Sequence, residues 1–202
     1  GPGGVVLFKK SPFDFILPDT RPQPSEMTHK LTLMATPGEL ETTSFGVLPT
    51  RAVPGATVLV SDLTGPQGTI PAAAVDARVA QVWAQKGLRG KSSATITVPE
   101  ALVKDDSLNW LDPQWTEDNL PSCPPEAPVK MDLEPSRAKQ VFLIVSVPED
   151  VRAGDYTGTV RVGNPAEPAT LELTVHVLPS KLRPPAWTIG MYYNDNLGPQ
   201  VP

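Results

Sequence analysis

Cysteine and histidine are nearly absent, with one cysteine and two histidines among 202 residues. A single thiol, Cys123, excludes a disulfide within the chain. Zinc sites built from these residue types need about four ligands at short spacings, and His29 and His176 lie far apart in the sequence. There is also no glycine-rich phosphate-binding motif. The sequence therefore predicts no metal site, no cofactor and no cysteine or histidine nucleophile.

Basic residues are outnumbered, because 17 Lys and Arg stand against 22 Asp and Glu, for a net charge of −5. Binding to nucleic acid depends on a basic surface that contacts phosphates, so this balance argues against a nucleic-acid partner. No apolar run approaches the roughly 18 residues of a membrane-spanning helix. We therefore expect a mildly acidic protein with no nucleic acid partner and no membrane span.

Proline and glycine are plentiful, with 25 prolines and 15 glycines spread along the chain. Proline inside a helix removes a hydrogen bond and clashes with the preceding turn, so long helices have little room. Hydrophobic residues make up 40% of the chain, which is enough for a core at this length. The composition predicts an all-β fold, an antiparallel immunoglobulin-like β-sandwich over residues 1–183.

Alternating apolar residues mark the clearest strands, at 31–35 and 171–177, because successive side chains of a strand point to opposite faces. The run 141–147 is apolar at nearly every position, which predicts a central strand covered on both faces. Further short apolar segments are bounded by proline, glycine or aspartate. They predict strands near 13–17, 43–48, 56–60, 93–98 and 156–162.

Three segments interrupt this pattern. Residues 71–88 have a period that fits either a helix or a strand. Residues 105–136 contain six prolines and little periodicity, which predicts a long irregular Pro-rich loop inserted in the sandwich. Residues 184–202 begin with two prolines, as a linker would, and continue into a short apolar strand at 187–193 that has nothing left to pair with.

The sequence Gly154-Asp155-Tyr156 predicts a structural turn into the strand near 156–162. Glycine lets the backbone adopt a positive φ and reverse sharply. A tyrosine at the start of such a strand resembles the tyrosine corner of immunoglobulin-like sandwiches, in which the ring packs over a loop and the hydroxyl bonds its backbone.

Three stretches together, at 35–45, 58–63 and 147–160, resemble the N-terminal β-sandwich domain that precedes the catalytic barrel in glycoside hydrolase family 123-like proteins. The resemblance spans about 31–193. It implies that 71–88 is a strand, that 187–193 is the first strand of a following barrel absent from this chain, and that the protein is secreted or periplasmic.

Catalytic candidates are weak. Glycoside hydrolysis needs two carboxylates about 5–10 Å apart. The close acidic pairs all fall in predicted turns or loops, where we expect them to be solvated: Glu39 and Glu41, Asp105 and Asp106, Glu149 and Asp150. The catalytic acids of the family lie in the barrel, so the resemblance transfers none of them, and we expect this chain not to be an enzyme.

Function therefore rests on three hypotheses. The first is a non-catalytic N-terminal β-sandwich module of a larger glycoside hydrolase-like protein, partnered with a downstream barrel domain of the same polypeptide. The second is a carbohydrate-binding module that stacks a glycan on Trp110 and Trp115 of the Pro-rich loop. For these two residues themselves we favour the alternative, that they anchor the long loop to the sandwich. The third is an extracellular structural subunit that self-associates through edge strands, with residues 5–8 exchanged between copies.

Overall fold

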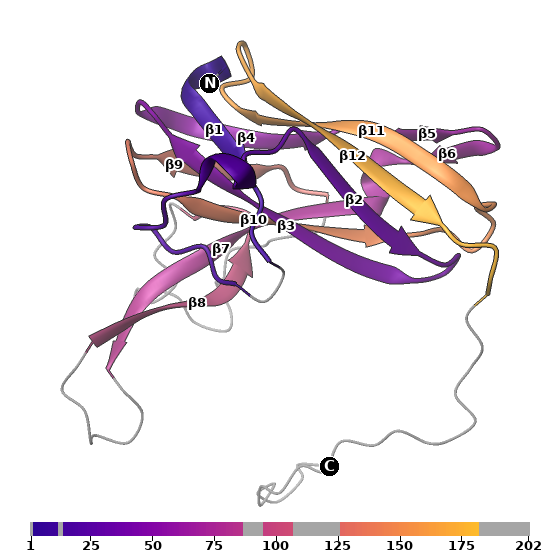
Figure 1. Cartoon of the computed structure of the whole chain (residues 1–202), viewed down its shortest axis with the longest axis horizontal. Coiled ribbons are helices and arrows are strands. Elements are labelled where there is room, and N and C mark those ends of the chain that lie inside the picture. The colour runs from indigo at the N-terminus through magenta and orange to yellow at the C-terminus, as the bar shows by residue number, and fades with distance from the viewer. Residues whose placement is uncertain (1, 12–13, 87–94, 107–125, 182–202) are drawn as a thin grey trace, which may run out of the picture.

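The computed structural model describes residues 2–11, 14–86, 95–106 and 126–181, and Figure 1 shows them as two packed β-sheets. Sheet I has the strand order β1 (Val5–Phe8), β3 (Leu40–Pro49), β10 (Lys139–Ser146), β7 (Val75–Lys86), β8 (Thr95–Val103). Sheet II has the order β2 (Lys30–Ala35), β12 (Ala169–Val177), β11 (Gly154–Gly163), β4 (Val53–Val60), β9 (Val129–Leu133). The short hairpin of β5 (Leu63–Gly65) and β6 (Gly68–Ile70) pairs with β11. Single turns of 3-10 helix lie at Pro2–Gly4, Pro24–Glu26 and Ala72–Ala74.

The core lies between the sheets and is made by the inward side of each strand. In β10 the inward residues Val141, Leu143 and Val145 are fully buried, and the strands of sheet II contribute a matching row of buried residues. Each fully buried valine or leucine stabilises the fold by about 1.5–3 kcal/mol. The structure confirms the predicted all-β sandwich and the central position of β10.

The outward side of β10 differs from the prediction, since Phe142 and Ile144 are only half-buried instead of covered. The pairing also departs from a purely antiparallel sandwich at one place. Strands β2 and β12 run parallel, from Lys30 beside Glu172 to Ala35 beside Val177. Sheet II is therefore mixed.

Segment 105–136 is not irregular throughout, which corrects the predicted loop. Residues Val129, Met131 and Leu133 are buried and alternate with exposed Lys130 and Asp132, and they form β9 against β4. The six prolines of the segment obscured this five-residue alternation. The part at 107–125, with Trp110, Trp115 and Cys123, lies outside the described residues, as does 182–202 with the predicted linker and barrel strand.

The strand predicted near 13–17 was wrong over the part that the structure describes, residues 14–17. Ile16 is buried and Phe15 is exposed, as alternation predicts, but none of the described strands pairs with this segment. The backbone N–H of Ile16 instead donates to the Gln140 side-chain oxygen at 3.3 Å. This segment is an extended loop fastened to β10.

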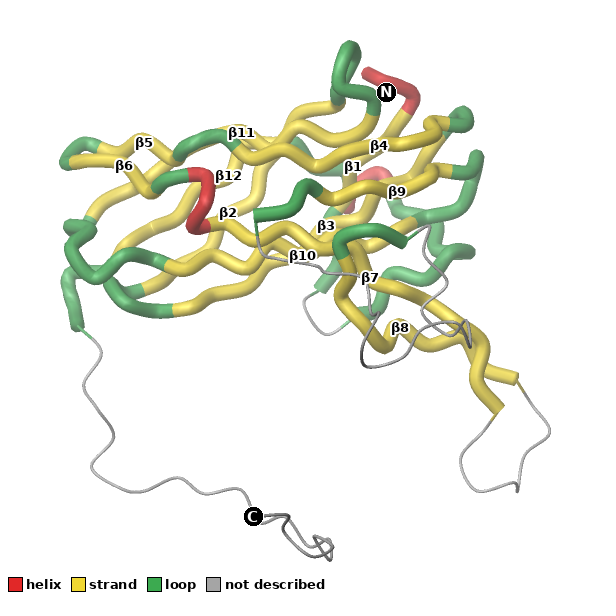
Figure 2. Tube along the Cα trace, turned by 180° about the vertical axis from the view of Figure 1, so that it is seen from behind, coloured by secondary structure: helices red, strands yellow, loops and turns green. Residues whose placement is uncertain are grey.

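Residues 71–88 form a strand over most of their length, as the resemblance implied, with one 3-10 turn before it. The first half of β7, from Val75 to Val79, pairs with β10, while the second half pairs only with β8. Pairing with β8 begins at Val79, and its register shifts just beyond, between Gln81 and Val82. Beyond it, β7 and β8 leave the sandwich as a two-stranded ribbon, which both views show (Figures 1 and 2).

Candidate functional site

The predicted turn Gly154-Asp155-Tyr156 forms a structural corner, which we call the Tyr156 corner. Gly154 has φ +146°, and the Tyr156 ring is fully buried. The Tyr156 hydroxyl donates to the Arg152 backbone oxygen at 2.9 Å, and Asp155 Oδ1 contacts His176 Nδ1 at 2.5 Å across the strand pair. The corner joins its loop to sheet II, as the tyrosine motif predicted.

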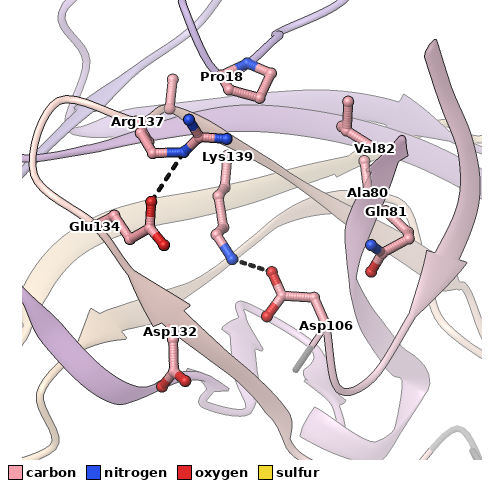
Figure 3. Close-up of a pocket in the computed structure, with 10 residues that line it drawn as sticks. Pro18, Ala80, Gln81, Val82, Asp106, Asp132, Glu134, Arg137 and Lys139 are labelled. Atoms are coloured by element: carbon pink, nitrogen blue, oxygen red, sulfur yellow. Dashed lines mark hydrogen bonds and ion pairs between the residues drawn. The ribbon is translucent and has the colours of Figure 1, made fainter. Parts of the chain in front are cut away.

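A second polar site, which we call the Asp106 pocket, lies where the β7–β8 ribbon leaves the sandwich (Figure 3). Its volume is about 160 Å³, and it is open to solvent on one side. Its apolar lining consists of Pro18, Ala80, Val82 and Ala138. Its polar lining consists of Gln81, Asp106, Asp132, Glu134, Arg137 and Lys139.

Four separate elements bring these polar residues together. Gln81 lies at the register shift in β7, Asp132 is on β9, and Lys139 opens β10. Asp106 follows β8, where a parallel bridge from Asp105 to Lys130 and the Asp106 N–H bonded to the Lys130 oxygen hold it beside β9. The pocket therefore depends on the contact between the base of the ribbon and β9.

Asp106 is the most buried charged group of the pocket. Only 7% of its side chain is exposed, and Oδ2 forms an ion pair with Lys139 Nζ. Burial raises the pKa of Asp106 above its ordinary value, and this outweighs the opposing effects of Lys139 and the Asp132 backbone N–H. The expectation of a solvated turn acid was therefore wrong for Asp106.

Two side-chain oxygens of the lining residues have no hydrogen-bond partner within the described chain. They are Asp106 Oδ1 and Gln81 Oε1, and both atoms are inaccessible to solvent. A buried polar atom left without a partner costs about 1–3 kcal/mol. In Figure 3 the Asp106 carboxylate points toward Lys139 and away from Gln81.

The other two carboxylates of the pocket also have partners. Glu134 forms an ion pair with Arg137 at 3.0 Å, and Asp132 Oδ1 accepts the Gly55 backbone N–H at 2.7 Å. The pocket thus combines carboxylates that have partners with two buried oxygens that have none among the described residues.

The other acidic pairs of the sequence do not enter this pocket. Glu39 accepts the Thr36 backbone N–H at 2.7 Å and so closes its own turn, and Glu149 and Asp150 are exposed in the turn before the Tyr156 corner. Across residues 2–11, 14–86, 95–106 and 126–181, no group of three or more His, Cys, Asp or Glu side chains is placed to hold a metal ion.

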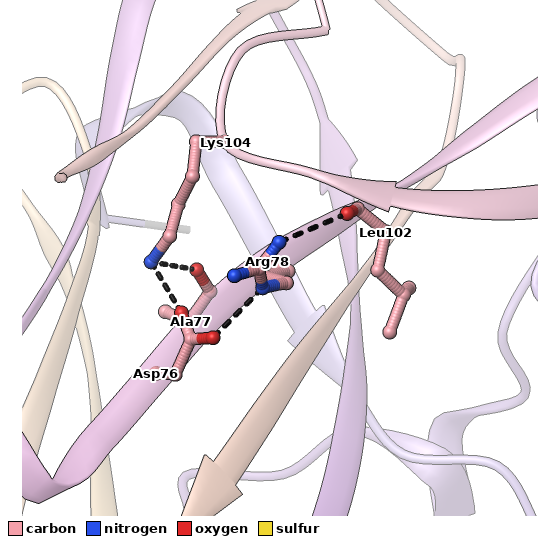
Figure 4. A network of polar contacts seen from close by, with 5 residues as sticks. All are labelled: Asp76, Ala77, Arg78, Leu102 and Lys104. Atoms are coloured by element: carbon pink, nitrogen blue, oxygen red, sulfur yellow. Dashed lines mark hydrogen bonds and ion pairs between the residues drawn. The ribbon is translucent and has the colours of Figure 1, made fainter. Parts of the chain in front are cut away.

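A different buried charge network strengthens the inner half of β7 (Figure 4). Lys104 is 4% exposed, and its Nζ pairs with Asp76 and donates to the Ala77 oxygen at 2.8 Å. Arg78 donates to Asp76 Oδ2 at 2.7 Å and to the Leu102 oxygen at 3.3 Å. These contacts connect β8 to β7, and we assign the network a structural role.

Comparison with known proteins gives a likeness of fold. No family model matches the sequence, and no curated protein matches it. Among solved structures, the chain is similar to a family 123 glycoside hydrolase from Clostridium perfringens, analysed for glycolipid glycan hydrolysis, with a TM-score of 0.57 and 14% sequence identity. The match covers 75% of this chain and 23% of that chain, so the present chain spans about a quarter of the hydrolase.

A chain of the CaDoc0917–CaCohA2 complex also matches, with a TM-score of 0.25, 15% identity and coverage of 74% of this chain and 99% of that chain. A TM-score this low does not indicate a shared fold. In the part of the chain that the structure describes, no helix is long and apolar enough to cross a membrane.

Proposed function

We propose that this chain is a non-catalytic β-sandwich module of a larger glycoside hydrolase-like protein, placed before a catalytic barrel that it supports. The observation that carries the proposal is the partial match to the family 123 hydrolase, in which a sandwich of this fold occupies 23% of a much longer chain. The three sequence stretches that resemble the sandwich of this family support the same role.

The lining of the Asp106 pocket also favours a role other than hydrolysis. A glycosidase acid and base must both be available to the substrate. Here Asp106 is held by Lys139, Glu134 by Arg137, and Asp132 by the Gly55 N–H. The proposal further implies a secreted or periplasmic protein, which fractionation of the source cells would test.

The test uses the natural reading frame that contains these residues. We expect the frame to continue beyond the codon for Pro202 into a barrel domain. The complete protein should hydrolyse glycolipid glycans, whereas the 202-residue chain should show no turnover above buffer. A frame that stops at Pro202 would overturn the accessory role, and turnover by the short chain that Asp106→Asn abolishes would overturn the non-catalytic assignment.

Strand exchange through residues 5–8 has less support. These residues form β1, which pairs with β3 of the same chain from Val5 beside Pro49 to Phe8 beside Gly46. Val5, Leu7 and Phe8 are buried in the sandwich. Exchange would require this strand to leave its own sheet.

A further inference from the structure

We propose that Lys139 and Asp106 condense with each other in the folded protein to form an isopeptide bond, a covalent cross-link between their side chains. The bond joins β10 of sheet I to the segment after β8, which is held beside β9 of sheet II. The inference goes beyond the accessory role, because it concerns a modification of this chain by its own residues and needs no second domain. It rests on the contact, the burial and the surroundings of the pair.

The two reacting groups are already in contact. Lys139 Nζ forms an ion pair with Asp106 Oδ2 (Figure 3), and only 23% and 7% of the two side chains are exposed. Groups that are held together in a suitable geometry react as if at an effective concentration of about 10⁵–10⁸ M. The fold therefore supplies the encounter that a free lysine and a free aspartate lack in water.

Burial removes the main obstacle to this reaction. In water an ammonium and a carboxylate are strongly hydrated, which favours the two ions over the amide. Asp106 is shielded from water, and its Oδ1 is buried with no hydrogen-bond partner among the residues described. Burial raises the pKa of Asp106, which favours the uncharged acid that the reaction needs. Condensation replaces two charges that are costly to bury with one neutral amide.

The reaction balances without any other reactant. The Lys139 ammonium passes one proton to the Asp106 carboxylate, which gives an amine and a carboxylic acid. The Nζ lone pair attacks Asp106 Cγ, a second proton moves from the nitrogen to the departing oxygen, and the Cγ–O bond breaks. The products are one amide and one water molecule, which leaves through the open side of the pocket. The Asp132 backbone N–H bonds to the Asp106 carboxylate and stabilises the negative charge that develops on the remaining oxygen.

A second buried pair offers a comparison within the same chain. Lys104 is 4% exposed, and its Nζ contacts the Asp76 carboxylate. Here, however, Arg78 also donates to Asp76 Oδ2 at 2.7 Å (Figure 4). Condensation at this pair would leave the Arg78 guanidinium without its anion. We therefore expect the bond at Asp106 and none at Asp76.

The experiment is intact-mass spectrometry of the 202-residue chain, purified in urea from inclusion bodies and then refolded. Forming the bond lowers the mass by about 18 Da, the mass of one water molecule. We expect this loss to accumulate over days in the refolded chain and to be absent from chain kept in urea. Freshly refolded chain still carries the ion pair, so the titration of Asp106 belongs to that form. A folded chain that keeps its full sequence mass overturns the proposal.

Peptide mapping then locates the loss of water. After digestion, the linked chain should give a branched peptide that contains residues 106 and 139. An aspartate that closes on its own backbone to a succinimide also loses one water, but it yields only linear peptides. Linear peptides that carry the loss, or a branch between Lys104 and Asp76, would contradict the assignment.

Two conservative variants test the residues. Lys139→Arg keeps a positive charge beside Asp106, but a guanidinium does not condense with the acid, so this variant should keep its full mass. Lys104→Arg is the matched control at the other buried pair and should lose one water as the wild type does. The opposite result in either folded variant overturns the proposal.

If a variant does not fold, the peptide map of the wild type decides the question. Absence of the bond leaves the accessory role standing, because that role depends on the reading frame and on activity of the longer protein.

Discussion

At the Tyr156 corner the buried hydroxyl has a partner, the Arg152 oxygen at 2.9 Å, whereas the Asp106 pocket holds two buried oxygens with none among the described residues. The corner is closed, since the Tyr156 ring is fully buried and packs against Gly65. The pocket is open to solvent on one side and charged. Both sites join a loop or ribbon to the sandwich, but only at the corner does the buried polar atom have a hydrogen-bond partner.

This difference predicts opposite effects of the two kinds of group on stability. A buried polar group that is hydrogen-bonded lowers the free energy of the folded state. A buried oxygen without a partner raises it by about 1–3 kcal/mol. Buried polar atoms without partners are uncommon in native proteins and are a reason to look for a bound molecule. Removing the hydroxyl at the corner should therefore lower stability, whereas removing an unpaired oxygen at the pocket should not.

The largest expected effect is at the corner. Tyr156→Ala removes a fully buried aromatic side chain and should lower the free energy of unfolding by about 3–5 kcal/mol. Tyr156→Phe keeps the ring and loses only the bond to the Arg152 oxygen, so it should lower it by about 1 kcal/mol. Urea unfolding measures both. Equal losses in the two variants would show that ring packing contributes little.

A smaller effect is expected from Gly65→Ala. A Cβ at this position would lie 2.6 Å from Tyr156 Cδ1, too close for the rigid ring to remain in place. Overpacking of this kind should destabilise the fold by about 1–3 kcal/mol. In the Tyr156→Ala background the clash is gone, so the same substitution should add little. Additive losses in the double variant would contradict the assigned contact.

The pH dependence of Asp106 should be smaller still. Its folded-state pKa is raised from 3.8 because burial disfavours the carboxylate. The folded protein therefore holds this proton to a higher pH than the unfolded chain does. The contribution of Asp106 to the free energy of unfolding should then fall as the pH rises from about 4 through the raised pKa, and level off above it.

Asp106→Asn cannot titrate, so it isolates this contribution. The difference in unfolding free energy, wild type minus variant, should decline with rising pH over that interval. Urea unfolding at intervals from about pH 4 to about pH 7 measures it. A difference that grows with pH would mean that the Lys139 ion pair outweighs burial.

The smallest effect on stability is expected for Gln81→Met. This change removes a buried oxygen that has no partner in the described structure, and it replaces the side chain with a flexible apolar one of similar volume. The free energy of unfolding should stay within about 0.5 kcal/mol of wild type or rise. A loss above about 2 kcal/mol would indicate that the Gln81 amide stabilises the ribbon, and would contradict the view that its unpaired oxygen does not stabilise the fold.

Local sequence patterns were sufficient for the corner and for the best strands. Alternation marked β2 and β12, the apolar run marked β10, and Gly154 next to Tyr156 marked the turn. Each of these features depends only on residues that are close together in the sequence. Alternation alone was not sufficient at 14–17, because a strand also needs a partner, and none of the described residues provides one.

The Asp106 pocket could not be predicted in this way. Gln81, Asp106, Asp132 and Lys139 come from four elements, and their meeting depends on a register shift in β7 and on β9. β9 was missed because five alternating residues lie at the end of a proline-rich segment. The signal that could have found it is the order Val129, Lys130, Met131, Asp132, Leu133.

The parallel pairing of β2 with β12 has a consequence for synthesis on the ribosome. About 130 residues separate the two strands in sequence, so one edge of β2 stays unpaired until nearly the whole domain has been translated. At about 5–20 residues per second, that interval lasts roughly 7 to 26 seconds. During it, the inward residues Leu31 and Leu33 lack their neighbours in β12, so the nascent chain is most open to mispairing or chaperone capture before residue 169 is made.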